Sequence, residues 1–167
     1  GDYSQKKVEE TNTPSMDIQI ASNFERLLYD VKECNSEVTK DVMTKIKNNN
    51  YKIGKNDLGK IKKNFISEML DENETLEMIK SISDEYQTVV DPHTAVGIGA
   101  IRKLGLEKNC VVLSTAHSCK FPKAIEDAIS KTENLPESFK HINNKKERFE
   151  LLSNDVEKVK KYVMNSI

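Results

Sequence analysis

The stretch CVVLSTAHSCKFPKAIEDAI, residues 110–129, decides the fold that we expect for this chain. It opens with an uninterrupted apolar run at 110–113, which is typical of a strand covered on both faces in a parallel sheet. The chain then turns polar at Ser114, Thr115 and His117. Pro122 suits the first turn of a helix, where no backbone donor is needed. The stretch therefore predicts a strand, a polar turn and a helix.

The polar turn after this predicted strand is a candidate binding site. Ligands of open α/β sheets gather outside the carboxyl ends of the strands. The turn places the hydroxyls of Ser114 and Thr115 and the imidazole of His117 at such an end. An alternative stays open, because serine and threonine at a strand end also cap the helix that follows.

Helical patterns dominate the rest of the chain. A helix is expected at 22–32, where Ser22 and Glu25 make a capping box before apolar residues that share one face. A second helix is expected from Ser36 to the asparagines Asn48, Asn49 and Asn50. Asp71 with Glu74 predicts the start of a helix that runs to about 86, and Asp91 is the predicted N-cap of a helix from Pro92 to Gly105. Further helices are expected from Pro122 to about Lys131, and from a cap at Ser153 onward. A weak helical turn is expected around Leu58, and residues 65–70 suit a short strand or an extended connector.

Gly97 and Gly99 lie inside the helix that is expected after Asp91. A glycine inside a helix costs about 1 kcal/mol relative to alanine. The pair therefore indicates close packing against a backbone or a ligand, and packing is the commoner reason.

A single predicted strand is too few for a parallel sheet, because an inner strand needs a neighbour on each side. The pattern is therefore that of a helical bundle with one odd strand, or of part of a sheet whose other strands lie outside this sequence. We divide the chain into a connecting loop, a helical segment, a helix-strand-helix core and a carboxyl-terminal helical segment, at 1–21, 22–86, 87–131 and 132–167.

Composition restricts the partners and the compartment. The 26 Lys and Arg residues against 27 Asp and Glu residues give a net charge of −1, which favours neither nucleic acid nor an anionic membrane surface. No run approaches the roughly 18 apolar residues of a membrane span. Three cysteines without staple-like spacing suit a reducing compartment, so we expect a cytoplasmic protein. Cys110, His117 and Cys119 lack the spacing of structural zinc ligands, so we expect no metal.

Two other places carry weaker candidates for binding. Asn23 and Arg26 share a flank of the first turns of the helix at 22–32, where unpaired amides favour an anion. A solvated flank is the commoner reason for two such residues. His93 lies at the start of its helix, where capping is the alternative to a binding role.

Three phrases together resemble one family, the threonine synthases, which are pyridoxal-phosphate enzymes of fold type II. The phrases are PSMDIQIASNFERLLYDV from Pro14, VVDPHTAVGIGA from Val89 and VVLSTAHSCKFPKAI from Val111. In order and spacing they resemble the carboxyl-terminal part of the bacterial and fungal type of this enzyme. The resemblance implies a helix-rich α/β fold with few strands of an otherwise incomplete parallel sheet. It also implies conversion of O-phosphohomoserine and water to threonine and phosphate.

The resemblance implies roles for particular residues. Thr115 matches the hydroxyl that faces the ring nitrogen of pyridoxal phosphate in this fold class, and Ser114 and His117 line the same turn. The weaker candidates for the substrate or its phosphate are Asn23, Arg26, His93 and Lys120. An arginine suits phosphate because a guanidinium can form two parallel hydrogen bonds with it.

The chain also departs from the family pattern. Ser118 and Cys119 stand where the family usually has Pro and Ala, which loosens the turn and brings a thiol near the cofactor region. The family's Schiff-base lysine and its glycine-rich phosphate loop lie upstream of the first matching phrase, and neither motif is found here. We therefore expect an amino-terminal portion of the same enzyme as partner, and no activity from this chain alone. The alternative is a noncatalytic helical interaction or regulatory module on the same scaffold.

Overall fold

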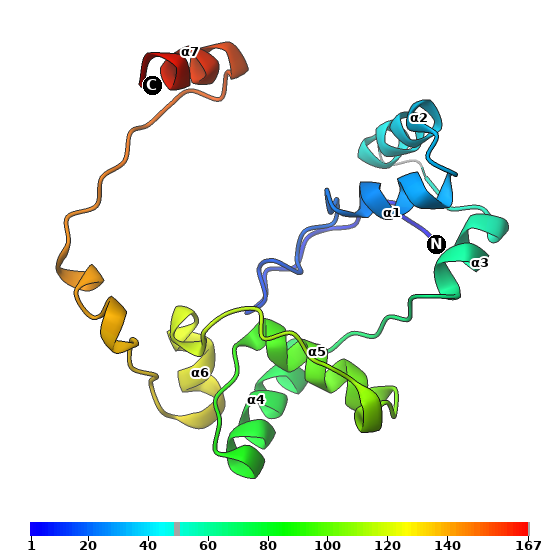
Figure 1. The fold of residues 1–167 in the computed structure, drawn as a ribbon. Coiled ribbons are helices and arrows are strands. Elements are labelled where there is room, and N and C mark those ends of the chain that lie inside the picture. The colour runs from blue at the N-terminus through cyan, green and yellow to red at the C-terminus, as the bar shows by residue number, and fades with distance from the viewer. Residues whose placement is uncertain (49–50, 167) are drawn as a thin grey trace. The chain divides into compact units, whose positions relative to one another are not determined.

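The structure is a computed structural model that describes residues 1–48 and 51–166. It consists of helices joined by loops (Figure 1). The chain divides into two compact units, Gly1–Asn134 and Leu135–Ile167, and each is described by itself.

The first unit contains six of the helices. They are α1 (Phe24–Val31), α2 (Ser36–Lys47), α3 (Lys55–Lys62), α4 (Glu72–Tyr86), α5 (Pro92–Lys103) and α6 (Pro122–Ile129). Short 3-10 turns lie at Glu107–Asn109 and Ser118–Lys120, and in the second unit at Glu137–Phe139 and Ile142–Asn144, before α7 (Val156–Ser166). The expected helices therefore form. Asn49 and Asn50, part of the predicted end of the second helix, lie outside the described residues. No helix in the described ranges is long and apolar enough to cross a membrane.

The starts of α4 and α5 confirm the caps predicted for them. Asp71 accepts a hydrogen bond from the amide of Glu74 at 2.8 Å, and the Glu74 carboxylate accepts one from the amide of Asp71 at 2.8 Å. A hydrogen bond from Lys103, together with this amide, holds the pKa of Glu74 below its usual value. At α5, the Asp91 carboxylate accepts from the amide of His93 at 3.0 Å. Gly105 follows this helix with φ +66°, a conformation that glycine adopts without strain.

Two predicted helix starts are wrong. Helix α1 begins after Asn23, and no side chain caps it, so the capping box of Ser22 and Glu25 does not form. A backbone turn satisfies the first amide instead, because Phe24 N donates to the carbonyl of Ala21 at 3.1 Å. Helix α7 begins after Asp155 rather than at Ser153. The Asp155 carboxylate accepts from the amide of Lys158 at 3.0 Å, the bond that an N-cap makes.

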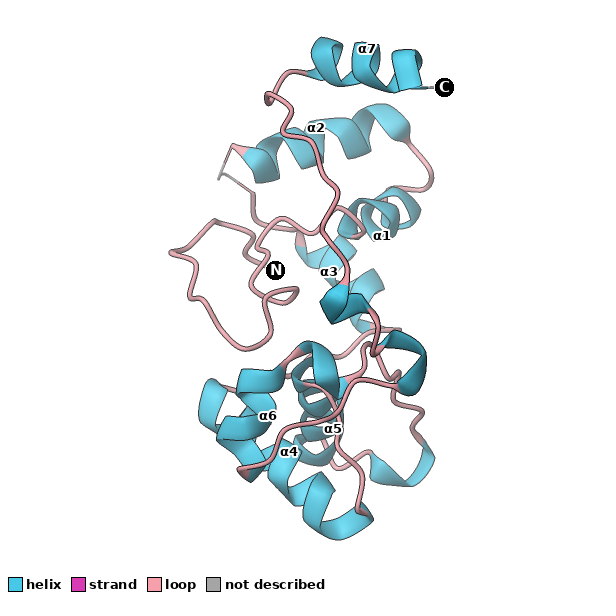
Figure 2. Ribbon diagram, turned by 90° about the vertical axis from the view of Figure 1, so that its left-hand side faces the viewer, coloured by secondary structure: helices cyan, strands magenta, loops and turns pink. Residues whose placement is uncertain are grey.

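The strand predicted at 110–113 does not form. Figure 2 draws no strand in the described part of the chain, where the bridge between Asp2 and Lys52 is isolated. The segment leaves Cys110 with an extended backbone, φ −111° and ψ 143°, yet Val111 is 90% exposed and Leu113 is 76% exposed. A strand needs a second backbone to accept and donate its hydrogen bonds. Residues 65–70 likewise form a connector and not a strand.

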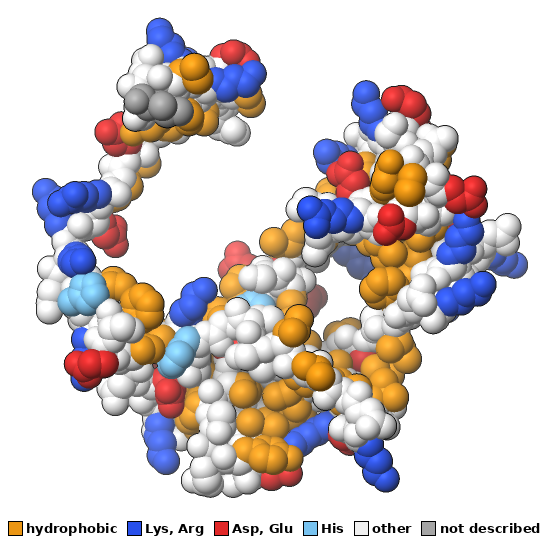
Figure 3. Space-filling view, in the orientation of Figure 1, with side chains coloured by type: hydrophobic (Ala, Val, Ile, Leu, Met, Phe, Trp, Pro, Cys, Tyr) orange, Lys and Arg blue, Asp and Glu red, His pale blue; other side chains and the backbone are white. Residues whose placement is uncertain are grey.

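Two hydrophobic clusters stabilise the first unit. One joins α1 and α2, where the buried residues are Leu28, Val42, Met43, Ile46 and Ile53. Tyr3 and Phe24 pack against this cluster and stack on each other, with ring centroids 4.6 Å apart. The other joins α4, α5 and α6 through Ile79, Ala95 and Ile125, each with 0% exposure. Because Ala95 lies in the first turn of α5, this second cluster holds that turn in place. Other hydrophobic side chains remain at the surface in the space-filling view (Figure 3).

The two glycines of α5 differ in the space around them. A Cβ atom at Gly99 would lie 2.3 Å from Leu70 Cδ2, which confirms the close packing predicted there. At Gly97 the nearest atom would be Val112 Cγ1 at 3.4 Å, an ordinary contact. This contact places the extended segment 110–113 against α5.

The substitution Gly97→Ala is expected to raise the free energy of unfolding by about 0.5–1 kcal/mol, because alanine has the higher helix propensity. Gly99→Ala should bring no gain, since Leu70 has to move to admit the new methyl group. Urea denaturation of the two variants beside the parent chain measures the difference. Equal stabilisation by both substitutions would contradict the close packing at Gly99.

Candidate functional site

The polar turn at 114–117 is anchored to the first turn of α5. The amide of Thr115 donates to Thr94 Oγ1 at 3.1 Å. Thr115 Oγ1 lies 3.4 Å from Thr94 Oγ1 and 3.4 Å from Asp91 Oδ1. Thr115 itself is exposed, whereas Asp91 and Thr94 are 1% and 4% exposed. The hydroxyl of an exposed residue thus rests on a buried polar support.

Asp91 is the centre of this support. Its carboxylate accepts from the amide of His93 at 3.0 Å, from the amide of Thr94 at 3.4 Å, and from the Thr94 hydroxyl. These donors stabilise a carboxylate that burial would otherwise disfavour. Among the residues that the structure describes, no buried side-chain nitrogen or oxygen lacks a hydrogen-bond partner.

His93 links this support to the amino-terminal loop. Its Nδ1 atom lies 3.3 Å from Asp91 Oδ1, and its Nε2 atom accepts from the amide of Ser15 at 3.3 Å. These partners assign the ring hydrogen to Nδ1. The ring is buried and packs against Phe121, with centroids 5.0 Å apart. Both ring nitrogens of this candidate residue are thus used inside the protein.

Ser114 and His117 line a surface depression of about 420 Å³ beside the turn. Its lining residues are Gln87, Thr88, Val89, Val90, Ser114, Ala116, His117, Ser118 and Glu133. The His117 Nδ1 atom accepts from the amide of Cys119 at 3.2 Å and caps the short turn Ser118–Lys120. The Lys120 side chain is exposed at the end of the same turn.

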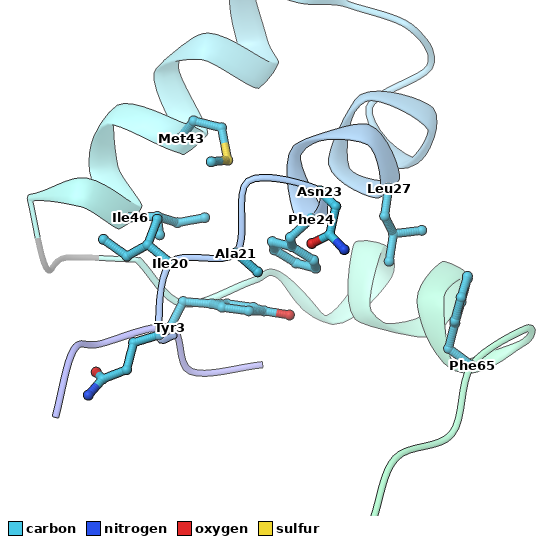
Figure 4. Close-up of a pocket in the computed structure, with 10 residues that line it drawn as sticks. Tyr3, Ile20, Ala21, Asn23, Phe24, Leu27, Met43, Ile46 and Phe65 are labelled. Carbon is cyan, nitrogen blue, oxygen red and sulfur yellow. The ribbon is translucent and has the colours of Figure 1, made fainter. Parts of the chain in front are cut away.

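Asn23, which directly precedes α1, and Arg26, which lies within it, line two different depressions away from the turn. The one beside Asn23 has a volume of about 390 Å³ and is mainly apolar (Figure 4). The one beside Arg26 has a volume of about 620 Å³ and includes the acids Glu25 and Asp30. Both candidate residues are exposed. The structure thus groups Ser114, Thr115, His117, His93 and Lys120 around one turn, with Asn23 and Arg26 in different depressions.

Sequence reasoning missed the part that Asp91 and Thr94 play at this turn. It assigned Asp91 to helix capping alone and gave Thr94 no role. The local signal was present, because an N-cap side chain accepts a hydrogen bond from the amide two or three residues later, and Thr94 stands three residues after Asp91. The contact with Thr115 spans 21 residues of sequence and comes from the tertiary structure.

The sequence and the fold of this chain were compared with those of known proteins. Residues 94–163 match the family model described as "Threonine synthase, C-terminal". The chain is 32% identical over 165 residues to threonine synthase of Pseudomonas aeruginosa. This alignment covers 96% of this chain and 35% of the Pseudomonas protein. The chain belongs to the threonine synthase family. The resemblance carried by the three sequence phrases is thereby confirmed.

Further threonine synthases agree in sequence and in structure. The Saccharomyces cerevisiae enzyme is 34% identical over 183 residues, covering 92% of this chain and 35% of that protein. The crystal structure of threonine synthase from Brucella melitensis with bound pyridoxal phosphate superposes with a TM-score of 0.80 at 32% identity. That superposition covers 98% of this chain and 36% of the Brucella chain. The chain thus spans about a third of the length of these threonine synthases, and its helix-rich fold is that of their carboxyl-terminal portion.

Proposed function

We propose that this chain provides the carboxyl-terminal part of a pyridoxal-phosphate-dependent threonine synthase, which converts O-phosphohomoserine and water to threonine and phosphate. The observation that carries the proposal is the hydroxyl of the exposed residue Thr115, held at the end of the 110–113 segment by the buried Asp91 and Thr94. The match with threonine synthases, one of them solved with bound pyridoxal phosphate, supports it.

The residues of the turn fit one side of a pyridoxal-phosphate site. When bound, this cofactor supplies an electron sink through its ring, and the protein orients the ring and tunes its nitrogen. Thr115 presents a neutral hydroxyl for that nitrogen, and Ser114 and His117 line the depression beside it. The lysine that binds the cofactor and the loop that holds its phosphate are assigned to the amino-terminal portion of the enzyme.

The proposed substrate contacts divide into exposed and buried groups. The guanidinium of Arg26 and the ammonium of Lys120 are exposed cations that suit a phosphate, and Asn23 offers an exposed amide. His93 is buried with both ring nitrogens bonded, so its proposed part is to hold Asp91 and the loop at Ser15 in place.

A chimeric enzyme tests the proposed function. This chain replaces the matching carboxyl-terminal portion of the Pseudomonas aeruginosa threonine synthase, and phosphate release from O-phosphohomoserine is measured. We expect release from the chimera, and none from the Pseudomonas portion alone or from this chain alone, because each lacks part of the site. Size-exclusion chromatography and circular dichroism establish whether the chimera is folded.

A folded chimera without phosphate release would reject the proposal and favour a noncatalytic helical module. The isolated chain provides a second control. Mixed with pyridoxal phosphate, it should give no absorbance band of covalently bound cofactor, since the binding lysine is assigned to the other portion. A clear band would show that this chain carries its own reactive lysine.

A further inference from the structure

We propose that α7 docks through its apolar side into an apolar groove of the amino-terminal portion of the enzyme, and that it becomes a stable helix only when it docks. The inference rests on the proposed function, because that function assigns the amino-terminal portion as the partner of this chain. The apolar side of α7 consists of Val156, Val159, Tyr162, Val163 and Met164.

The second unit has no buried core of its own. Among the side chains that the structure describes at 135–142 and 144–166, none is buried. Val156 is 69% exposed and Met164 is 73% exposed, and in the connector before the helix Leu151 is 91% exposed. The apolar side of an amphipathic helix is normally buried against another element. The second unit lacks such a cover.

Helix α7 is too short to be stable by itself. It has 11 residues, and isolated helices shorter than about 12–15 residues are marginal in water. Asp155 caps its first turn, and Lys160 pairs with Glu157 at 2.8 Å, but an exposed pair of this kind contributes little. Most of the stability of helices in proteins comes from packing of the apolar face. The stability of α7 therefore depends on what covers that face.

The apolar side of α7 is wide enough to fill a groove. At about 100° per residue, its five positions span roughly 200° of the helix circumference, from Tyr162 through Val159 to Met164. A helix that lies on a flat surface needs an apolar stripe of only about 100°. The apolar arc of α7 therefore indicates a helix that is covered from more than one side.

The polar groups of α7 are compatible with this burial. Lys160 and Ser166 fall within the apolar arc, but the Lys160 ammonium pairs with Glu157 and the Ser166 hydroxyl donates to the carbonyl of Tyr162 at 2.9 Å. Both groups are thus bonded within the helix. The opposite arc is polar and would stay in water; it consists of Glu157, Lys158, Lys161 and Asn165.

Two observations favour the amino-terminal portion of the enzyme as the cover. The match to the threonine synthase family model extends to residue 163, so most of α7 belongs to the part of the chain that the family shares. The superposition on the Brucella enzyme covers 98% of this chain and only 36% of that chain. About two thirds of that enzyme is therefore polypeptide with no counterpart in this sequence, and a body of that size can supply a groove.

A second copy of this chain is a poorer cover for α7. An 11-residue helix is roughly 16 Å long and about 10 Å wide, so one side of it has a projected area of roughly 160 Å². A stable dimer buries about 800 Å² on each partner. A single facing helix would also cover one side only, whereas the apolar arc extends over two.

Hydrogen exchange of the α7 amides tests the docking. We expect the amides of Val163 and Met164 to exchange near the rate of an unfolded peptide in the isolated chain, and at least a hundredfold more slowly in the folded chimera. The amide of Ile82 within α4 should be slow in both and reports the stability of the first unit. Slow exchange of the α7 amides in the isolated chain, or fast exchange in the folded chimera, overturns the inference.

Val163→Asp and Asn165→Asp are a matched pair of variants of the chimera. Each adds one negative charge to the last turn of α7, so the effect of that charge on the helix itself is common to both. They differ in that Val163 lies on the apolar side and Asn165 on the polar side. We expect the Met164 amide to exchange at least tenfold faster in Val163→Asp and to stay slow in Asn165→Asp. Equal rates in the two variants contradict docking through the apolar side.

Phosphate release separates a failure of this inference from a failure of the proposed function. A chimera that releases phosphate while its α7 amides exchange fast rejects the docking alone. A folded chimera that releases no phosphate while its α7 amides are slow rejects the proposed function and leaves the docking standing. If Val163→Asp unfolds the chimera, the Ile82 amide shows it, and the comparison of the isolated chain with the parent chimera still decides the inference.

Discussion

Replacing Asp91 by alanine is expected to lower the free energy of unfolding by about 3 kcal/mol, whereas the same change at Asp71 should cost about 1 kcal/mol. Both residues are N-caps, of α5 and α4, so the loss of a cap is common to the two variants. They differ in burial. The carboxylate of Asp91 is 1% exposed and accepts from His93, Thr94 and Thr115.

The difference arises from what each substitution leaves behind. Without Asp71, the amide of Glu74 bonds to water at the exposed start of α4. Without Asp91, buried amide and hydroxyl donors lose their acceptor, and each unsatisfied buried donor costs about 1–3 kcal/mol. Urea denaturation of the two variants and the parent chain measures both costs. Equal losses would mean that Asp91 acts as an ordinary cap and that the buried network adds nothing to stability.

The substitution Thr115→Val in the chimeric enzyme is expected to lower kcat by about tenfold to a hundredfold while the protein stays folded. The estimate corresponds to the roughly 1–3 kcal/mol that it costs to leave a buried hydrogen-bonding group, here the cofactor ring nitrogen, without its partner. Folding should survive because Thr115 is exposed, and because its amide, which valine retains, makes the bond to Thr94.

Two matched variants separate the hydroxyl from the shape of the side chain. Thr115→Ser keeps the hydroxyl and should retain most of the turnover. Thr44→Val removes a threonine hydroxyl from the exposed face of α2, where it donates to the Lys40 carbonyl of the same helix, and should leave turnover unchanged. Phosphate release at saturating substrate measures all three. Parent-like turnover in Thr115→Val would remove this residue from its proposed role.

The helices and two of their caps could be predicted from sequence because the forces that place them are local. Asp71 with Glu74, and Asp91 with Pro92, determine helix starts through bonds that span two or three residues. The same reasoning was wrong at Ser22 and Ser153. At the start of α1 a backbone turn satisfies the first amide, through the carbonyl of Ala21. At the start of α7 the side chain of Asp155, not that of Ser153, accepts from a helix amide.

The strand at 110–113 was wrong for a different reason. An apolar run indicates that a segment prefers an extended, buried environment, but a strand exists only when another backbone pairs with it. The described residues bring no such backbone to this segment, and Val111 and Leu113 stay exposed. The apolar run thus indicates a preference for an extended and buried environment, which the described part of the chain does not provide.

By itself, the sequence determined the helical character of the chain, its family and the choice of Thr115 as a candidate cofactor-binding residue. Periodicity, caps and motifs are patterns among residues that lie close together in the sequence. Only the tertiary structure decided that Asp91 and Thr94 lie behind Thr115 and that His93 is bonded on both ring nitrogens. It also decided that Asn23 and Arg26 line depressions separate from the one beside the turn. These facts depend on packing between residues far apart in the chain. This packing determines which donors and acceptors meet, as it does for Thr115 with Thr94 and for His93 with Ser15.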